Sequence, residues 1–222
     1  MLAALRARIH FRLVRQLAQL LALVAFASTG AQAALPTHTI LVVGDSLSAE
    51  YGLPRDTGWV KRLSERISSQ DPQYSVVNAS ISGDTTSGGR ARLPSLLKRV
   101  QPDIVVLELG ANDGLRGLDL EQMRGNLQAM IDACHAVRAR VLLIGIRIPP
   151  NYGRDYSERF FENYAWLARR NRIEQVPFLL EGFADRLDLF QPDHIHPSRE
   201  AQMLMVDNVW PRLQPLMRQR AP

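Results

Sequence analysis

The chain has 222 residues, 46% hydrophobic and 22% charged, a balance typical of a globular protein of one or two domains. This composition excludes a disordered chain, a collagen-like repeat and a disulfide scaffold, and the single cysteine excludes an intrachain disulfide and a cysteine-rich zinc site. A formal net charge of +5 would favour nucleic acid or an anionic surface as partner if the basic residues were spread over the whole chain.

Most of the excess charge lies in the first 33 residues. They contain no acidic residue and four arginines, Arg6, Arg8, Arg12 and Arg15. An apolar run over 17–27, broken only by Gln19, follows, and then the small-residue site Ala31-Gln32-Ala33. These are the parts of a cleavable secretory signal, and the run is shorter than the roughly 20 apolar residues that span a bilayer. We expect cleavage after Ala33, the alternative being an uncleaved N-terminal helix.

A cleaved leader changes the charge argument. Residues 34–222 carry 23 basic against 22 acidic side chains, a net charge of +1. We therefore expect a periplasmic or secreted protein with no stable membrane anchor and no nucleic acid as a partner. A small-molecule ligand and a monomer are expected instead.

Short apolar runs alternate with amphipathic segments over the rest of the chain. In chain order they predict strand 39–43, helix 59–67, strand 74–79, helix 90–100, strand 104–109, helix 120–137, strand 141–146, helix 156–172, strand 177–180 and helix 198–216. Ser198 is the expected N-cap of the last helix. Strands that are apolar on both faces and alternate with helices indicate a parallel sheet covered on both sides. The expected fold class is a single three-layer α/β/α domain over 34–222, flavodoxin-like, with a five-stranded parallel sheet.

Polar residues collect in the loops that follow these strands. The segments are Gly44-Asp45-Ser46-Leu47, Ser82-Gly83-Asp84, Gly110-Ala111-Asn112-Asp113 and Asp193-His194-Ile195-His196. Because the carboxyl ends of parallel strands share one edge of a sheet, we expect the four loops to converge there.

The converging residue types are those of a serine acyl hydrolase. A serine hydroxyl needs an adjacent base, which His196 can supply to Ser46. Asp193, three residues earlier, can hold the other ring nitrogen and stabilise the imidazolium. An oxyanion needs donors, for which the backbone N–H groups of Ser46 and Gly83 and the side-chain amide of Asn112 are candidates.

Each segment also has an ordinary interpretation. Gly-Asp-Ser is a common turn, Asn112-Asp113-Gly114 could be a plain loop, and Asp193 to His196 could be a surface turn. The conjunction of all four at one edge favours catalysis. The chain has no G-x-S-x-G, which argues against an α/β-hydrolase. No metal-ligand spacing accompanies His194 and His196, so neither a metal nor another cofactor is expected.

The same segments resemble the signature blocks of the GDSL or SGNH hydrolases. The stretches 77–85 and 107–117 are similar to its bacterial periplasmic branch of thioesterase I, lysophospholipase and arylesterase, and the resemblance covers about 39–216. It implies Ser46 as nucleophile, Asp193 and His196 as its triad partners, and Gly83 and Asn112 in the oxyanion hole. It also implies hydrolysis of esters and thioesters through an acyl-enzyme.

One departure from that family is Glu50, which replaces a small residue. Its carboxylate would either narrow the mouth of the site or, as we expect, point to solvent.

Two further segments are expected to shape a substrate groove. Arg147, Ile148 and Pro149 follow the fourth strand and would form one wall, with Arg147 able to meet a head group. Leu115 begins the segment 115–120, which would form the other wall and is a candidate lid. A carbohydrate acetyl esterase and a non-catalytic binding module on the same fold remain as alternatives.

Overall fold

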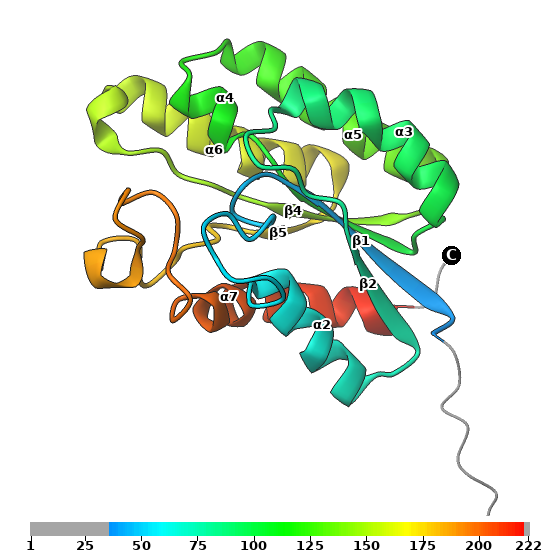
Figure 1. The fold of residues 1–222 in the computed structure, drawn as a ribbon. Helices are drawn as coiled ribbons and strands as arrows, with labels where there is room; N and C mark the ends of the chain where they lie inside the picture. Colours follow the sequence, from blue (N-terminus) through cyan, green and yellow to red (C-terminus); the bar gives the residue numbers. More distant parts are fainter. Residues whose placement is uncertain (1–35, 220–222) are drawn as a thin grey trace, which may run out of the picture. The chain divides into compact units, whose positions relative to one another are not determined.

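The computed structural model describes residues 36–219, apart from the side chain of Pro150; the expected leader lies outside the described residues. A parallel sheet in the order β2-β1-β3-β4-β5 forms its centre (Figure 1). The strands are β1 (His38–Gly44), β2 (Tyr74–Asn78), β3 (Ile104–Glu108), β4 (Arg140–Ile144) and β5 (Glu174–Val176). The expected five-stranded α/β fold is confirmed.

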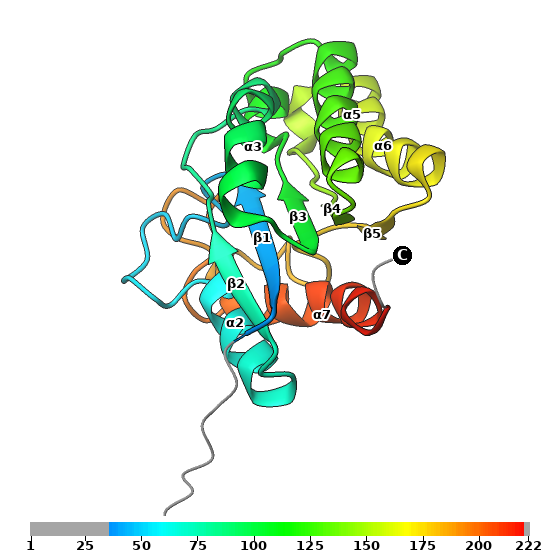
Figure 2. The same ribbon diagram turned by 90° about the vertical axis from the view of Figure 1, so that its right-hand side faces the viewer.

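Helices cover both faces of the sheet. On one face lie α2 (Trp59–Gln70) and α7 (Gln202–Arg218), and on the other lie α3 (Thr86–Val100), α5 (Leu120–Ala136) and α6 (Arg154–Asn171) (Figures 1 and 2). A short helix α4 (Ala111–Leu115) and two 3₁₀ turns, η1 (Pro150–Tyr152) and η2 (Leu187–Leu189), lie in the connections. No helix in the described range 36–219 is long and apolar enough to cross a membrane.

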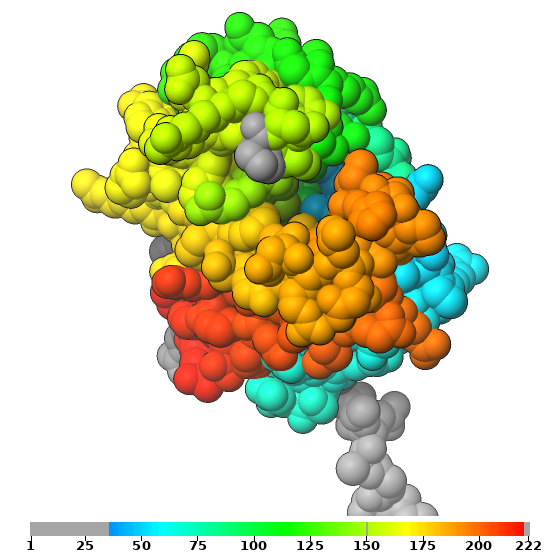
Figure 3. All heavy atoms as spheres, turned by 90° about the vertical axis from the view of Figure 1, so that its left-hand side faces the viewer, coloured from blue at the N-terminus to red at the C-terminus, as the bar shows by residue number. Residues whose placement is uncertain are grey.

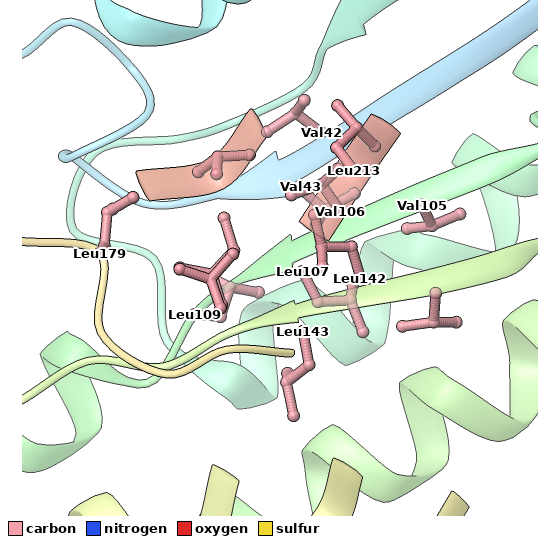
Figure 4. Close-up of a cluster of buried hydrophobic side chains, with 14 of the residues drawn as sticks. Val42, Val43, Val105, Val106, Leu107, Leu109, Leu142, Leu143, Leu179 and Leu213 are labelled. Carbon is pink, nitrogen blue, oxygen red and sulfur yellow. The ribbon is translucent and has the colours of Figure 1, made fainter. Parts of the chain in front are cut away.

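The core sits between these layers, on both faces of the central strands. All five residues of β3 are buried, as are the last five of β1. Figure 4 shows Val42, Val106 and Leu142 from neighbouring strands packed with Leu213 of α7. Such burial on both faces is what the near-continuous apolar runs predicted.

The fifth strand is not where the sequence placed it. The expected strand 177–180 is a turn, and β5 is the preceding segment Glu174–Val176. Pro177 has no N–H for the ladder, and Leu179 donates its N–H to the Gly145 carbonyl at 3.0 Å. The side chains of Phe178, Leu179 and Leu180 are buried although these residues are not in a strand. The apolar run in the sequence therefore indicated burial correctly but not secondary structure.

The start of the last helix was also predicted wrongly. Helix α7 begins at Gln202 with Ala201 as its N-cap residue, not at Ser198. The Ser198 hydroxyl donates to the Glu200 carboxylate at 2.8 Å instead of capping the helix. The side chain of Gln202 accepts the Trp59 N–H at 2.9 Å, which fixes the start of α7 against α2.

Candidate active site

The loops at the carboxyl ends of the strands gather at one edge, at the left in Figure 1. Figure 3 looks onto this face and shows a hollow between the orange segment near residue 190 and the green segments above it, with blue atoms near β1 at its bottom. The pocket has a volume of about 750 Å³ and contains Ser46, Gly83, Asn112 and His196 in its lining. The structure therefore brings together residues from four separate loops.

Ser46 and His196 form a direct hydrogen bond across 150 residues of sequence. The Ser46 Oγ lies 2.8 Å from Nε2 of His196, and the other ring nitrogen, Nδ1, lies 2.7 Å from Oδ2 of Asp193. The three side chains thus form one continuous chain of hydrogen bonds. This is the arrangement in which an imidazole can accept a serine proton while a carboxylate steadies it.

A tight turn builds the Asp193 end of that chain. Its Oδ1 accepts the backbone N–H groups of Ile195 and His196, both at 3.0 Å, and His194 takes the left-handed φ of +57° that the turn requires. Partial burial opposes ionisation of Asp193, but these two N–H groups and the His196 ring outweigh it and lower its pKa to about 2. Asp193 is therefore an ionised acceptor for an Nδ1–H, which leaves Nε2 free to accept the Ser46 proton.

The three predicted oxyanion donors line the same pocket. Among the described residues, the backbone N–H groups of Ser46 and Gly83 have no protein acceptor. Gly83 has a φ of +79°, and the nearest neighbour of a Cβ built there would be Arg116 at 3.8 Å. A side chain would therefore fit in space, and glycine is needed for the positive φ. The Asn112 amide, in α4, donates to Oδ2 of Asp45 at 3.2 Å and to the Asp84 carbonyl at 3.0 Å. An acyl oxygen at this position would share one of these amide hydrogens.

Two buried carboxyl groups that sequence reasoning missed support the Ser46 loop. Glu108, the last residue of β3, accepts the Ser48 hydroxyl at 2.6 Å and the Asp45 N–H at 3.3 Å. Asp45 in turn accepts the Leu47 N–H at 3.1 Å. Burial raises the pKa of Asp45 to about 7 and that of Glu108 well above its ordinary value. A carboxyl residue within a buried apolar strand is the signal that could have found Glu108.

The residues predicted for the groove all line the pocket. They are Leu115, Arg147, Ile148 and Pro149. The Arg147 guanidinium lies 3.7 Å from the centre of the Phe161 ring, a cation–π contact that holds it against the wall. Most of the remaining apolar lining comes from residues that sequence reasoning did not assign to the site: Tyr51, Ile146, Phe178, Leu180, Ala184 and Phe190.

Glu50 neither narrows the mouth nor points freely into solvent. Its carboxylate accepts the backbone N–H of Gly58 at 2.7 Å and that of Asp56 at 3.0 Å. Glu50 therefore fastens the long β1–α2 loop, and the expectation of a solvent-facing side chain was wrong.

The candidate lid is tied at two points. The Tyr152 hydroxyl donates to the Leu115 carbonyl and the Tyr156 hydroxyl to the Leu118 carbonyl, both at 2.9 Å. These bonds connect the segment 115–120 to the chain around the start of α6.

Within 36–219 no group of three or more histidine, cysteine or acidic side chains could hold a metal ion.

The sequence of the chain matches the GDSL-like lipase/acylhydrolase family over residues 42–204. The chain belongs to this family. It is 49% identical to esterase TesA of Pseudomonas aeruginosa over 81% of the chain and 90% of the relative. It is 43% identical to thioesterase 1/protease 1/lysophospholipase L1 of Escherichia coli K12 over 83% of the chain and 87% of the relative.

Comparison with a solved structure agrees with the fold. A psychrotrophic esterase, EstA from Pseudoalteromonas sp., inhibited by monoethylphosphonate, superposes with a TM-score of 0.78 at 38% identity, covering 82% of this chain and all of that one. The four segments that converge on the pocket all lie within residues 42–204, which the family match spans.

Proposed function

We propose that this GDSL-family chain is a serine hydrolase that cleaves carboxylic esters and acyl thioesters through an acyl-enzyme. The observation that carries the proposal is the continuous hydrogen-bonded chain from Ser46 through His196 to Asp193, opening into an apolar pocket of about 750 Å³. Ser46 is the nucleophile, His196 the general base and then acid, and Asp193 the group that orients the imidazole.

The reaction proceeds in two balanced halves. His196 Nε2 takes the Ser46 proton as Oγ attacks the acyl carbon, and the oxyanion is stabilised by the N–H groups of Ser46 and Gly83 and the Asn112 amide. Collapse breaks the bond to the leaving alcohol or thiol, which receives the proton from His196. Water, deprotonated by His196, then attacks the acyl-enzyme and releases the acid and free Ser46. No step needs a metal or a cofactor.

The pocket supports a medium to long acyl chain as the part of the substrate that is held. Its walls are apolar at Ile146, Ile148, Phe178, Leu180 and Phe190, and 750 Å³ lies within the range of sites that bury a molecule of drug size. The relatives named esterase, thioesterase and lysophospholipase support an arylesterase, thioesterase or lysophospholipase-type activity. An acetyl group would leave most of this pocket unfilled, which disfavours a carbohydrate acetyl esterase.

The proposal includes the place where the enzyme works. Residues 1–33 are a secretory leader cleaved after Ala33, and 34–222 form a single monomeric domain in the periplasm or outside the cell. The arginines, apolar run and small-residue site of the leader support this.

Replacement of the nucleophile tests the activity. Ser46→Ala should lower turnover of a p-nitrophenyl acyl ester at least about 10³-fold and abolish labelling by an organophosphonate, because the attacking oxygen is gone. Ser82→Ala is the matched control, since Ser82 lines the same pocket and takes no part in the hydrogen-bonded chain. If Ser46→Ala kept most of its turnover, Ser46 would not be the nucleophile and the proposed mechanism would be wrong.

A further inference from the structure

Large apolar side chains are exposed around the mouth of the pocket. Eleven exposed large hydrophobic residues occur in the described part of the chain, and six come from loops at this edge. We call these six the apolar rim: Tyr51, Ile81, Leu118, Tyr152, Leu187 and Ile195. Their exposed fractions run from 38% for Tyr152 to 60% for Leu187.

Each member of the apolar rim lines the pocket or lies within three residues of one that does. Tyr51 and Ile195 line the pocket themselves, and Ile81 directly precedes the lining residues Ser82 and Gly83. The Tyr152 hydroxyl donates to the carbonyl of the lining residue Leu115, and Leu118 comes three residues after Leu115. Leu187 lies between the lining residues Ala184 and Phe190. The rim therefore continues the apolar wall outward from the pocket.

The exposed apolar residues elsewhere are of a different kind. They are Val77, Val137, Trp166, Met203 and Leu204. None of them lines the pocket, and Trp166 is covered by the guanidinium groups of Arg124 and Arg170 at 4.7 and 5.2 Å. Single exposed apolar residues are ordinary on any surface, whereas a group of them around one opening marks a site of interaction.

We propose that the apolar rim docks the enzyme on the surface of an amphiphile aggregate, a micelle or bilayer that contains its acyl substrate. This inference rests on the proposed function, since it states how an acyl chain reaches the pocket. A protein partner or a second copy seated on this rim would cover the mouth and block it. A lipid surface covers the same side chains and delivers the chain to be cleaved, so the tail passes from lipid to pocket without crossing water.

A triple substitution separates docking from catalysis. Ile81→Ser, Leu118→Ser and Leu187→Ser are combined, because none of these three side chains lines the pocket. Val137→Ser, Met203→Ser and Leu204→Ser form the control, because these residues have similar exposed fractions and belong neither to the apolar rim nor to the pocket lining. Binding to phosphatidylcholine vesicles is measured by co-sedimentation with both triples also carrying Ser46→Ala, which prevents turnover. Hydrolysis is measured on a short monomeric ester and on a long-chain ester below and above its critical micelle concentration.

The rim triple should lose vesicle binding by about tenfold or more, because withdrawing a half-exposed Leu or Ile from water is worth a factor of about five. It should lose the rise in rate above the critical micelle concentration, yet stay within about twofold of wild type on the monomeric ester. The control triple should match wild type throughout. Binding should persist in high salt, since apolar contact drives it.

Several outcomes would overturn docking. These are unchanged vesicle binding by the rim triple, an equal loss in the control triple, and an equal loss on the monomeric ester. A wild-type dimer that the rim triple dissociates would show a second copy as the occupant. If the triple unfolds, as seen by circular dichroism, Leu187→Ser alone is tested against Val137→Ser. Failure of the proposed function is distinct, because wild type would then hydrolyse no ester while vesicle binding is still measured.

Discussion

Asp45 directly precedes Ser46, Glu108 accepts hydrogen bonds from the same loop, and both carboxyl groups are fully buried. Asp45 has hydrogen bonds from Leu47 and Asn112, whereas Oε1 of Glu108 has no partner among the described residues. Ionisation of both carboxyl groups would place two negative charges close together in a buried site, which costs free energy. Burial accounts for the raised pKa of each, and the nearby charges of Asp84 and Asp113 add to the effect on Asp45.

This burial predicts that stability falls as pH rises. The pKa of Asp45 is about 7 in the folded protein against an ordinary 3.8, so between about pH 4 and 7 the folded state holds a proton that the unfolded state has released. The free energy of unfolding then declines with pH, by at most about 1.4 kcal/mol per pH unit for one proton. Asp45→Asn should make this slope shallower by the share of one proton, while Glu108, whose pKa is also raised, keeps its own share. Urea unfolding of both proteins at pH 4, 5, 6, 7 and 8 measures it.

Asp193 is a control, because its pKa is lowered where that of Asp45 is raised. Its pKa is lowered to about 2, so its contribution to stability is present above pH 4 and is lost as pH falls toward 2. Asp193→Asn should therefore leave the slope between pH 5 and 7 unchanged. A slope as steep in Asp45→Asn as in the wild type would show that Asp45 does not hold the proton.

At the scale of the element, α4 is a short helix whose start is set by a close contact. Gly110 precedes it with a φ of +121°, and a Cβ there would lie 2.2 Å from the hydroxyl oxygen of Tyr164. That hydroxyl is buried and donates to the Leu109 carbonyl at 3.0 Å. Gly110 thus allows β3 to pass directly into the helix that carries Asn112.

Gly110→Ala should displace α4 and with it the Asn112 amide. We expect a loss of about 2–4 kcal/mol in the free energy of unfolding, from the positive φ and the overlap with Tyr164, together with a lower kcat. Gly117→Ala is the control, because Gly117 has a φ of +64° with nothing within 4 Å of an added Cβ. It should lose only about 1–2 kcal/mol and keep its kcat. Equal effects of both on kcat would contradict a role for this contact.

The elements also show what a sequence can and cannot predict. Long apolar or amphipathic runs predicted β1, β3 and α5 closely, because their periodicity reflects burial. The edge strand β5 was not predicted, because Glu174 and Gln175 are polar and give no apolar run. The loop residues of the site were found because glycine, serine, asparagine and histidine follow predicted strands. The carboxylate contacts of Glu50 and Glu108 depend on tertiary packing, which no local pattern encodes.

At the scale of the molecule, the distribution of charge distinguishes the proposed leader from the rest of the chain. Four arginines and no acid lie in residues 1–33, so their removal takes the net charge from +5 to +1. A nearly neutral domain is suited to an apolar substrate at a lipid surface, because docking through the apolar rim does not require net attraction. With the proposed leader removed, the basic excess serves export and gives no argument for an anionic partner.

The proposed leader predicts a precise N-terminus. Expressed in a Gram-negative host, the chain should appear in the periplasmic fraction beginning at Ala34, because signal peptidases select small residues at the positions of Ala31 and Ala33. Ala33→Leu should block cleavage and leave the precursor at the membrane, whereas Gln32→Leu, at the unselected position between the two alanines, should be processed normally. Intact-mass spectrometry of each fraction measures this. A periplasmic protein that still begins at Met1 would contradict the leader and restore the net charge of +5 to the working enzyme.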